Sequence, residues 1–315
     1  MRKDNSKNDY PIMIDAAEKG KAAIVFIFTL TSDTSKYFFG DQTGSGVIIS
    51  DDGYIVTNHH VIERGIEIHI LLDDKREYIA ELIGADSTHD VALLKIKANG
   101  LPFLQFGDND SLRIGEPVLA VGNPYRLQST VTSGIISAID RDIKLENNVT
   151  RNFIQMDVPI NLGNSGGALV NTKGQLMGLN TAIISSSGEY EGFSFALPSN
   201  LVKKIVSDLR EFGTLRKASI GFNIRPVSQG IAHESGMNEI YGVVVESLKP
   251  GGAADSAGIQ SLDILLDIND RKITSIPDFM GQLELFRPGD VITLRALRNG
   301  TIHTIDVHMQ EVQKD

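Results

Sequence analysis

The stretch 163–167 reads Gly-Asn-Ser-Gly-Gly and lies between two apolar runs, 153–156 and 168–170. Glycines reach backbone angles that other residues avoid, so this turn can aim several amide N–H groups at one point beside the Ser165 hydroxyl. Acyl transfer needs that combination of a nucleophile and donors that stabilise an oxyanion. A glycine-rich hairpin with a hydrated serine is the alternative. A serine nucleophile also requires a base and an acid that orients the base.

Two upstream stretches supply a base and an acid. The apolar run that begins at Gly53 leads into His60, and Asp90 stands at the start of the apolar run 91–96. The chain order His60, Asp90, Ser165 is that of chymotrypsin-type proteases and differs from the order in subtilisins and α/β-hydrolases. In this scheme Ser165 attacks the scissile carbonyl, His60 takes its proton, and Asp90 orients the imidazole.

Two histidines are adjacent, and only one of them can be the base. Neighbouring side chains on an extended strand point to opposite faces, so we expect only one to reach Ser165. A metal site made of His59, His60, His89 and Asp90 is the alternative, but the sequence contains no His-Glu-x-x-His or similar ligand spacing. We therefore expect neither a metal nor a cofactor.

Composition narrows the classes of protein to which the chain can belong. The 315 residues, 41% of them hydrophobic, are enough for two domains with real cores. A net charge of −10 argues against a nucleic-acid partner or an anionic membrane surface. The absence of cysteine excludes disulfides, thiol nucleophiles and cysteine-ligated zinc.

Targeting is left open by the residues themselves. No stretch approaches the ~20 apolar residues of a membrane span, and residues 1–9 lack the hydrophobic core of a signal peptide. The chain is either cytoplasmic or exported with its targeting or anchor segment removed.

Short apolar runs separated by turn residues predict an all-β architecture of two barrels. The expected strands are 22–31, 43–49, 54–57, 66–72, 77–84 and 91–96, then 117–121, 130–139, 153–156, 168–171, 175–184 and 192–197. A helix follows, with Ser199 as its N-cap and Gly213 as its stop. Residues 1–20 form a polar N-terminal segment that is weakly helical over 13–19.

A second domain begins at Ile220. Its expected strands are 242–246, 263–268, 291–297 and 301–307, and its expected helices are 253–257 and 277–286. Asn299-Gly300 predicts a hairpin turn between the last two strands.

Six motifs together resemble the HtrA family of serine proteases, and because one PDZ-like region follows, the chain is most similar to the family's DegS type. The motifs are 44–49, 57–61, 90–95, 122–124, 131–137 and 163–167. The resemblance extends from about Ile24 to about Val307. It implies a mostly β fold: a chymotrypsin-like double barrel over 21–213, a linker over 214–219 and a PDZ domain over 220–312.

The resemblance also implies roles for single residues in the protease domain. The family pattern Thr-Asn-x-His-Val makes His60 the catalytic histidine and His59 the variable position. The amides of Gly163, Asn164 and Ser165 are the implied oxyanion hole. Trypsin-like enzymes carry an acid six residues before the serine, where this chain has Pro159. A small apolar S1 pocket is therefore expected, with cleavage after small aliphatic residues; its implied lining is Ile160, Leu162, Thr181, Ala182 and Ile183.

Regulation is implied in the same way. Asn164 replaces the aspartate that pairs with a new N-terminus in chymotrypsin-like zymogens, so that salt bridge is not available. Arg141 matches the activating arginine of the DegS type on a loop ahead of the serine, and a solvated surface charge is the alternative.

The PDZ-like region is expected to bind C-terminal peptides by strand addition. In that mode the amides of Ile220, Gly221 and Phe222 hold the peptide carboxylate. Ser219 departs from the family's aromatic at its position, which affects peptide preference. Met280 and Leu283 line the peptide groove or, alternatively, belong to the core.

The expected function is a regulated, ATP-independent serine endoprotease of protein quality control or envelope stress signalling. Its implied partners are unfolded or regulatory protein substrates and C-terminal peptides. A homotrimer is implied through residues 1–20, with Tyr10 and the aromatics Tyr37, Phe38 and Phe39 as candidate contacts. The implied location is the periplasm, with an inner-membrane anchor as an open possibility. A protease-chaperone of the same family, or a PDZ scaffold with a silent protease domain, is the alternative.

Overall fold

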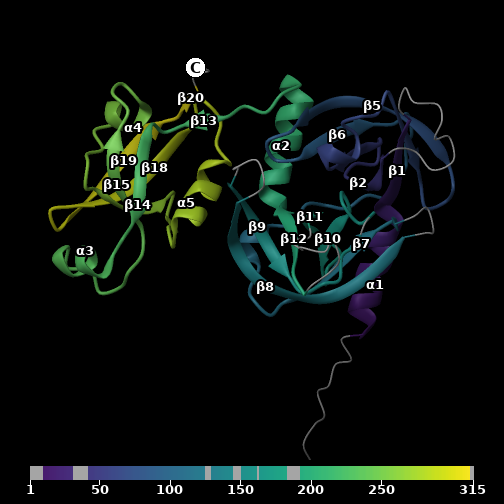
Figure 1. Cartoon of the computed structure of the whole chain (residues 1–315), viewed down its shortest axis with the longest axis horizontal. Coiled ribbons are helices and arrows are strands. Elements are labelled where there is room, and N and C mark those ends of the chain that lie inside the picture. The colour runs from purple at the N-terminus through teal and green to yellow at the C-terminus, as the bar shows by residue number, and fades with distance from the viewer. Residues whose placement is uncertain are drawn as a thin grey trace, which may run out of the picture. The chain divides into compact units, whose positions relative to one another are not determined.

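The computed structural model describes residues 10–30, 42–124, 129–144, 150–161, 163–182 and 192–312. The chain divides into two compact units, Met1–Leu215 and Arg216–Asp315 (Figure 1). Several residues singled out above lie outside the described ranges: Tyr37, Phe38, Phe39, Leu162 and Ile183.

The first barrel of unit 1 is a closed antiparallel sheet in the order β1-β2-β3-β6-β5-β4. Its strands are β1 Ile24–Leu30, β2 Gln42–Ile48, β3 Tyr54–Thr57, β4 Glu67–Leu71, β5 Glu77–Asp86 and β6 Val91–Lys95. Alternate apolar side chains such as Val25, Ile27 and Ile55 fill the barrel and are wholly buried.

The second barrel is also closed, in the order β10-β11-β12-β9-β8-β7. Its strands are β7 Pro117–Gly122, β8 Thr130–Lys144, β9 Thr150–Met156, β10 Ala168–Asn171, β11 Leu176–Ala182 and β12 Ser194–Pro198. Two closed six-stranded barrels in one unit confirm the chymotrypsin-like double barrel predicted from the sequence.

Two helices cover the barrels. Helix α1, Tyr10–Ala23, is longer than predicted and packs on β7, β8 and β10 of the second barrel. The helix lies so close to β7 that a Cβ at Gly20 would be 2.9 Å from Val121 Cγ2. Helix α2, Ser199–Phe212, packs on β5 and β6 of the first barrel and on β11 and β12 of the second, so it joins both barrels. The described part of unit 1 also contains two 3₁₀ turns, η2 His59–Val61 and η3 Asn109–Ser111.

The ends of α2 are built differently from one another. Gly213 adopts a left-handed φ of 72° and donates its N–H to Leu209 O, which confirms it as the helix stop. Ser199 is the first helical residue and does not cap it, because its hydroxyl donates to Gly107 O at 2.9 Å. Asn109 Oδ1 instead accepts from Asn200 N at 2.8 Å, so a side chain from η3 caps the helix.

Unit 2 is a sheet in the order β14-β15-β16-β18-β19, with β17 paired to β16. A small separate sheet joins β13 to β20. The strands are β13 Ala218–Ser219, β14 Phe222–Pro226, β15 Val243–Leu248, β16 Ile264–Ile268, β17 Arg271–Lys272, β18 Val291–Arg298, β19 Thr301–His308 and β20 Gln310–Glu311. Asn299 and Gly300 have positive φ values of 49° and 77°, which confirms the predicted hairpin turn between β18 and β19.

Both faces of this sheet are covered. Alternate residues of β15 divide between two apolar clusters: Val243 and Val245 face one, and Val244 faces the other. Helix α5, Ile276–Leu283, and helix α4, Ala253–Ser256, contribute to the first cluster, and helix α3, Gln229–Glu234, contributes to the second. Burial on both faces explains why Val243–Val245 of β15 and Ile264–Leu266 of β16 are unbroken apolar runs.

Asp267 of β16 is an ionisable side chain inside this covered sheet, with 7% of its surface exposed. Its Oδ2 lies 3.3 Å from Arg295 Nη1, whereas its Oδ1 has no hydrogen-bond partner among the described residues. Burial raises the pKa of Asp267 above its ordinary value; the Arg295 guanidinium opposes this rise and Asp270 adds to it.

We expect Asp267→Asn to stabilise unit 2 at neutral pH, because it removes a buried charge and keeps the side-chain shape. A folded-state pKa above the unfolded value of about 3.9 favours folding at low pH, and this contribution is lost as pH rises through the folded pKa. The advantage of the variant should therefore shrink as pH falls toward about 4. Calorimetry of the full chain at about pH 7.5 and about pH 4.5 measures this difference. Asp306→Asn, at an exposed carboxylate of β19, is the control, and equal behaviour of the two variants would contradict the assignment.

Candidate active site

The predicted base and acid lie in direct contact. His60 Nδ1 is 2.7 Å from Asp90 Oδ2, and the backbone N–H of His60 donates to Asp90 Oδ1 at 2.8 Å. An ionised carboxylate only accepts hydrogen bonds, so Nδ1 carries the hydrogen and the lone pair of the neutral ring is on Nε2. The imidazole is 46% exposed and the carboxylate 15%, so the ring remains accessible while the acid is largely covered.

The prediction placed the two histidines on an extended strand, but they lie on the turn η2. The chain leaves β3 at Asn58 because Asp90 binds the next two amides: its carbonyl accepts from His59 N at 3.1 Å, and its carboxylate accepts from His60 N. The two side chains still separate, since His59 Nδ1 lies 3.9 Å from Glu63 Oε2 and His60 faces Asp90.

Asp90 itself has a left-handed backbone, with φ of 59°. This conformation is costly for a residue with a Cβ and persists where neighbours hold it. Asn58 Nδ2 donates to Asp90 O at 2.9 Å and His59 N binds the same carbonyl, so two donors fix the peptide group that follows Asp90.

Ser165 lies on the predicted glycine turn, and this turn docks on the first barrel. Ser45 N of β2 donates to Ser165 O at 2.8 Å. Gly163 and Gly166 have φ values of 95° and 81°, and a side chain at Gly166 would collide with Ser45 O and Thr57 Oγ1. Only glycine therefore fits at Gly166.

Strand β11 links this turn to the acid. Gly166 N donates to Asn180 O at 2.8 Å, and the next residue, Thr181, places its hydroxyl 3.3 Å from Asp90 Oδ2. Asn58 Nδ2 also donates to Thr181 Oγ1 at 2.7 Å. His60, Asp90 and the Ser165 turn thus meet at the junction of the two barrels.

Thr181, which the resemblance placed in the lining of the S1 pocket, also contacts Asp90. Its hydroxyl donates to Asp90 Oδ2 and accepts from Asn58 Nδ2. The contact between Asn58 and Asp90 was not predicted. The only sequence signal for it is the position of Asn58 within the motif 57–61, two residues before His60.

Two other members of the implied pocket lie as follows. Ile160 is buried in the core of the second barrel, and Ala182 ends β11. Asn164 is buried at 5% exposure, donates its N–H to Asn161 O at 3.0 Å, and has an Oδ1 with no partner among the described residues.

Arg141 lies in strand β8, opposite Phe153 of β9, and not on a loop as expected. The strand is irregular here: the register shifts between Ala138 and Arg141, and Asp140 has φ of 57°. Arg141 Nε donates to Gln155 Oε1 at 2.9 Å. The side chain therefore contacts β9, the strand that precedes the Ser165 turn along the chain.

In unit 2, the expected carboxylate loop lies between β13 and β14. Gly221 has φ of 79°, and a Cβ there would lie 3.2 Å from Gly252 Cα. The carbonyls of Ile220 and Gly221 accept from Ala254 N and Lys249 N, whereas within the described chain no acceptor takes the N–H groups of Ile220 or Gly221. Two amides are thus held in place with their hydrogens available.

The two residues predicted to line a peptide groove differ in exposure on α5. β14 is an edge strand next to α5, and Phe222 stacks on Phe279 with ring centroids 5.8 Å apart. Leu283 belongs to the core of unit 2, as its alternative interpretation held, and Met280 of α5 is 48% exposed.

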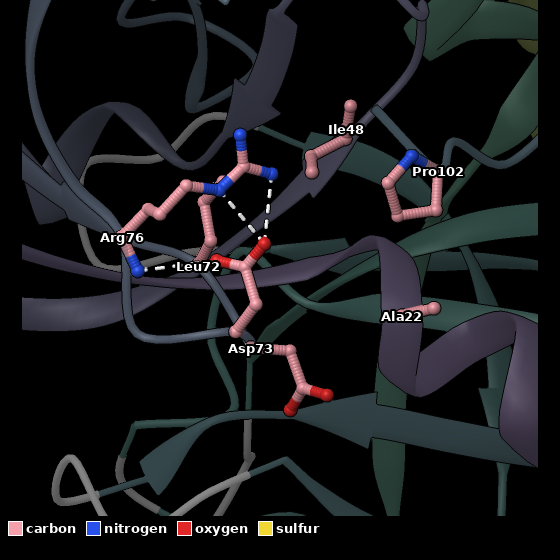
Figure 2. A pocket seen from close by; sticks show the side chains of 7 residues that line it. Ala22, Ile48, Leu72, Asp73, Arg76 and Pro102 are labelled. Atoms are coloured by element: carbon pink, nitrogen blue, oxygen red, sulfur yellow. Dashed lines mark hydrogen bonds and ion pairs between the residues drawn. The ribbon is translucent and has the colours of Figure 1, made fainter. Parts of the chain in front are cut away.

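A pocket of about 170 Å³ in unit 1 contains none of the predicted site residues (Figure 2). Arg76 and Asp74 form an ion pair at 2.7 Å on its wall, and Pro102 and Ala22 line the other side.

Among the described residues, no three His, Asp or Glu side chains converge as a metal site would require. None of the described helices is long and apolar enough to cross a bilayer.

Comparison with known proteins agrees with this geometry. The chain matches the family profile of a trypsin-like peptidase domain over residues 44–179 and that of a PDZ domain over residues 218–309. A probable periplasmic serine endoprotease, DegP-like, from Chlamydia muridarum is 39% identical over 269 residues, which cover 85% of this chain and 54% of the relative. The chain spans about half the length of this relative.

A second relative is matched over more of its length. It is a probable periplasmic serine protease, do/HhoA-like, from Haemophilus influenzae, 36% identical over 95% of this chain and 69% of its own. Among solved structures, the HtrA-type protease AlgW with a tripeptide has a TM-score of 0.75 and 35% identity, and covers 96% of this chain and 98% of that one. AlgW with a decapeptide has a TM-score of 0.69 at 34% identity. With two barrels, a His–Asp pair beside a glycine-rich serine turn and one PDZ domain, the chain belongs to the HtrA-type family of serine proteases.

Proposed function

We propose that the chain is a serine endopeptidase in which His60, Asp90 and Ser165 form the catalytic triad. The observation that carries this proposal is the 2.7 Å contact between His60 Nδ1 and Asp90 Oδ2 at the barrel junction where the Ser165 turn docks. Asp90 fixes the tautomer, so His60 Nε2 is free to take the Ser165 proton and later to deliver it to the leaving amine. The amides of Gly163 and Ser165 stabilise the tetrahedral oxyanion. The N–H of Asn164, the third predicted donor, is instead taken by Asn161 O at 3.0 Å.

Ser165→Ala and His60→Ala should each lower the rate by about 10⁶-fold, because the members of a triad act as one unit. His59→Ala should keep most of the activity, since His59 faces Glu63 and not Asp90. Casein hydrolysis by the purified full chain measures all three. An active His60→Ala beside a folded but inactive His59→Ala would reverse the assignment.

Substrates and location follow from the same proposal. Small aliphatic residues are the expected preference before the cleaved bond, because Pro159 offers no charge to a basic side chain. The proposed setting is the periplasm, as in the relatives' names, with unfolded or regulatory proteins as substrates. Sequencing of casein fragments tests the preference.

A homotrimer is proposed through the N-terminal segment. Helix α1 supports this because Ile12 and Ile14 are 48% and 56% exposed on it. Light scattering of the purified chain tests this assembly, and a monomer would contradict it.

Peptide binding at the PDZ domain is proposed to control the rate. The N–H groups of Ile220 and Gly221 suit a peptide carboxylate, and edge strand β14 suits an added strand. The AlgW structures with a tripeptide and a decapeptide support peptide binding of this kind. A bound peptide can raise activity only if it binds the active arrangement more tightly than the inactive one.

Arg141 is the proposed receiver of this control within the protease domain. Its bond to Gln155 ties the irregular part of β8 to β9, and β9 leads to the turn that carries the oxyanion donors. A change in the conformation of β8 would therefore reach the oxyanion turn through Gln155.

We expect an apolar decapeptide with a free C-terminal carboxylate to raise cleavage roughly 5- to 150-fold, the usual range for coupled sites. The same peptide as its C-terminal amide should fail. Arg141→Ala should bind the peptide normally in fluorescence polarisation but lose the rate increase. Arg113→Ala, at another exposed arginine of unit 1, should retain it. A constant rate in every case would indicate a constitutive protease.

A further inference from the structure

Ser45 of β2 makes several hydrogen bonds to and around the Ser165 turn, and no sequence motif indicated them. Its side chain is wholly buried, with 0% exposed. Its hydroxyl donates to Gly163 O at 2.6 Å and accepts from Asn123 N at 2.7 Å. Its own N–H donates to Ser165 O, and its carbonyl accepts from Thr57 Oγ1 at 2.7 Å. One residue of the first barrel thus holds two carbonyls of the turn.

The Gly163 carbonyl lies between the backbone amides that are proposed to bind the oxyanion. The carbonyl of Gly163 and the N–H of Asn164 share one planar peptide group. This group lies in the chain between the Gly163 and Ser165 amides, the two proposed oxyanion donors. Ser45 holds its oxygen end and Asn161 O holds its nitrogen end at 3.0 Å.

The backbone conformation of Gly163, which the Ser45 hydroxyl holds, is an uncommon one. Gly163 has φ of 95°, a region open to glycine, and glycine moves among backbone conformations more easily than other residues. A glycine turn therefore needs an external contact to keep one orientation, and the buried hydroxyl of Ser45 supplies it. Without this hydroxyl, Asn123 N would lose its partner in a buried place and Gly163 O in a partly buried one, which favours rotation of the turn.

We propose that Ser45 is a positioning residue for the oxyanion turn. Its hydroxyl orients the Gly163 and Ser165 amides and does not contact the substrate. The inference rests on the proposed protease function. It predicts a defect in transition-state stabilisation and not in substrate binding, because donors of an oxyanion act after the substrate is bound.

Ser45→Ala should lower kcat by about ten- to a hundredfold, the scale of a small misplacement of catalytic groups, with KM changed less than about twofold. The affinity of a peptidyl boronate, whose adduct with the serine presents an oxygen to the same donors, should fall by the same factor as kcat/KM. Ser45→Cys keeps a weak donor and should lie between wild type and Ser45→Ala.

Ser199→Ala is the matched control. Ser199 is also wholly buried, and its hydroxyl also donates to a backbone carbonyl, that of Gly107, at the start of α2. Its loss should lower the unfolding temperature comparably while kcat and boronate affinity stay at wild-type values.

The outcomes separate this inference from the function on which it rests. A wild-type chain without peptidase activity, or an active Ser165→Ala, would contradict the protease function itself. An active wild type in which Ser45→Ala keeps its kcat and boronate affinity would overturn the role of Ser45. Equal losses in Ser45→Ala and Ser199→Ala would overturn it too. If Ser45→Ala does not fold, an unchanged kcat in Ser45→Cys has the same meaning.

Discussion

The docking of a glycine-rich turn from one barrel onto strand β2 of the other is the contact on which the site depends. Ser45 N binds Ser165 O at 2.8 Å, and Gly166 leaves room for this approach because a side chain there would meet Ser45 O. The proposed nucleophile, Ser165, belongs to the second barrel, whereas the proposed base and acid, His60 and Asp90, belong to the first. The barrels must therefore keep their relative position to a fraction of an ångström, since small displacements of reacting groups are costly in rate. Helix α2, which packs on strands of both barrels, supports that position from elsewhere in the unit.

The same junction holds backbone conformations that an isolated segment would leave. Asp90 has φ of 59°, which costs a residue with a Cβ roughly 1–2 kcal/mol. Its carbonyl receives two hydrogen bonds, from Asn58 Nδ2 and His59 N, and each such bond contributes on the order of 1 kcal/mol. The strained residue is thus stabilised by the turn that carries His60. Asp90 and His60 are consequently placed by one local structure, while Thr181 from the second barrel contacts Asp90 and fixes it relative to the serine turn.

The barrels, the stop of α2 at Gly213 and the hairpin at Asn299 were predictable from the sequence because each depends on local rules: residue alternation, helix ends and turn residues. The His60–Asp90 contact was predicted from residue types and chain order. Features that depend on distant residues were not predictable. Ser199 looked like an N-cap, but Gly107 takes its hydroxyl and Asn109 caps the helix from 90 positions away. The resemblance placed Arg141 on a loop, whereas β8 continues beyond the predicted end at residue 139 to Lys144. Thr181 and Ser45 act across the junction between barrels, which no periodicity within one strand reveals.

Covalent labelling tests, without any assumption about substrates, whether the barrel junction makes Ser165 a nucleophile. The full chain is treated with a fluorophosphonate, digested, and mapped by mass spectrometry. A serine activated by His60 displaces the fluoride, so we predict one phosphonyl group per chain, on Ser165, and none in the His60→Ala variant. Labelling of His60→Ala at the wild-type rate, an adduct on a different serine, or no adduct on the wild-type chain in the presence of the decapeptide would contradict this role of Ser165.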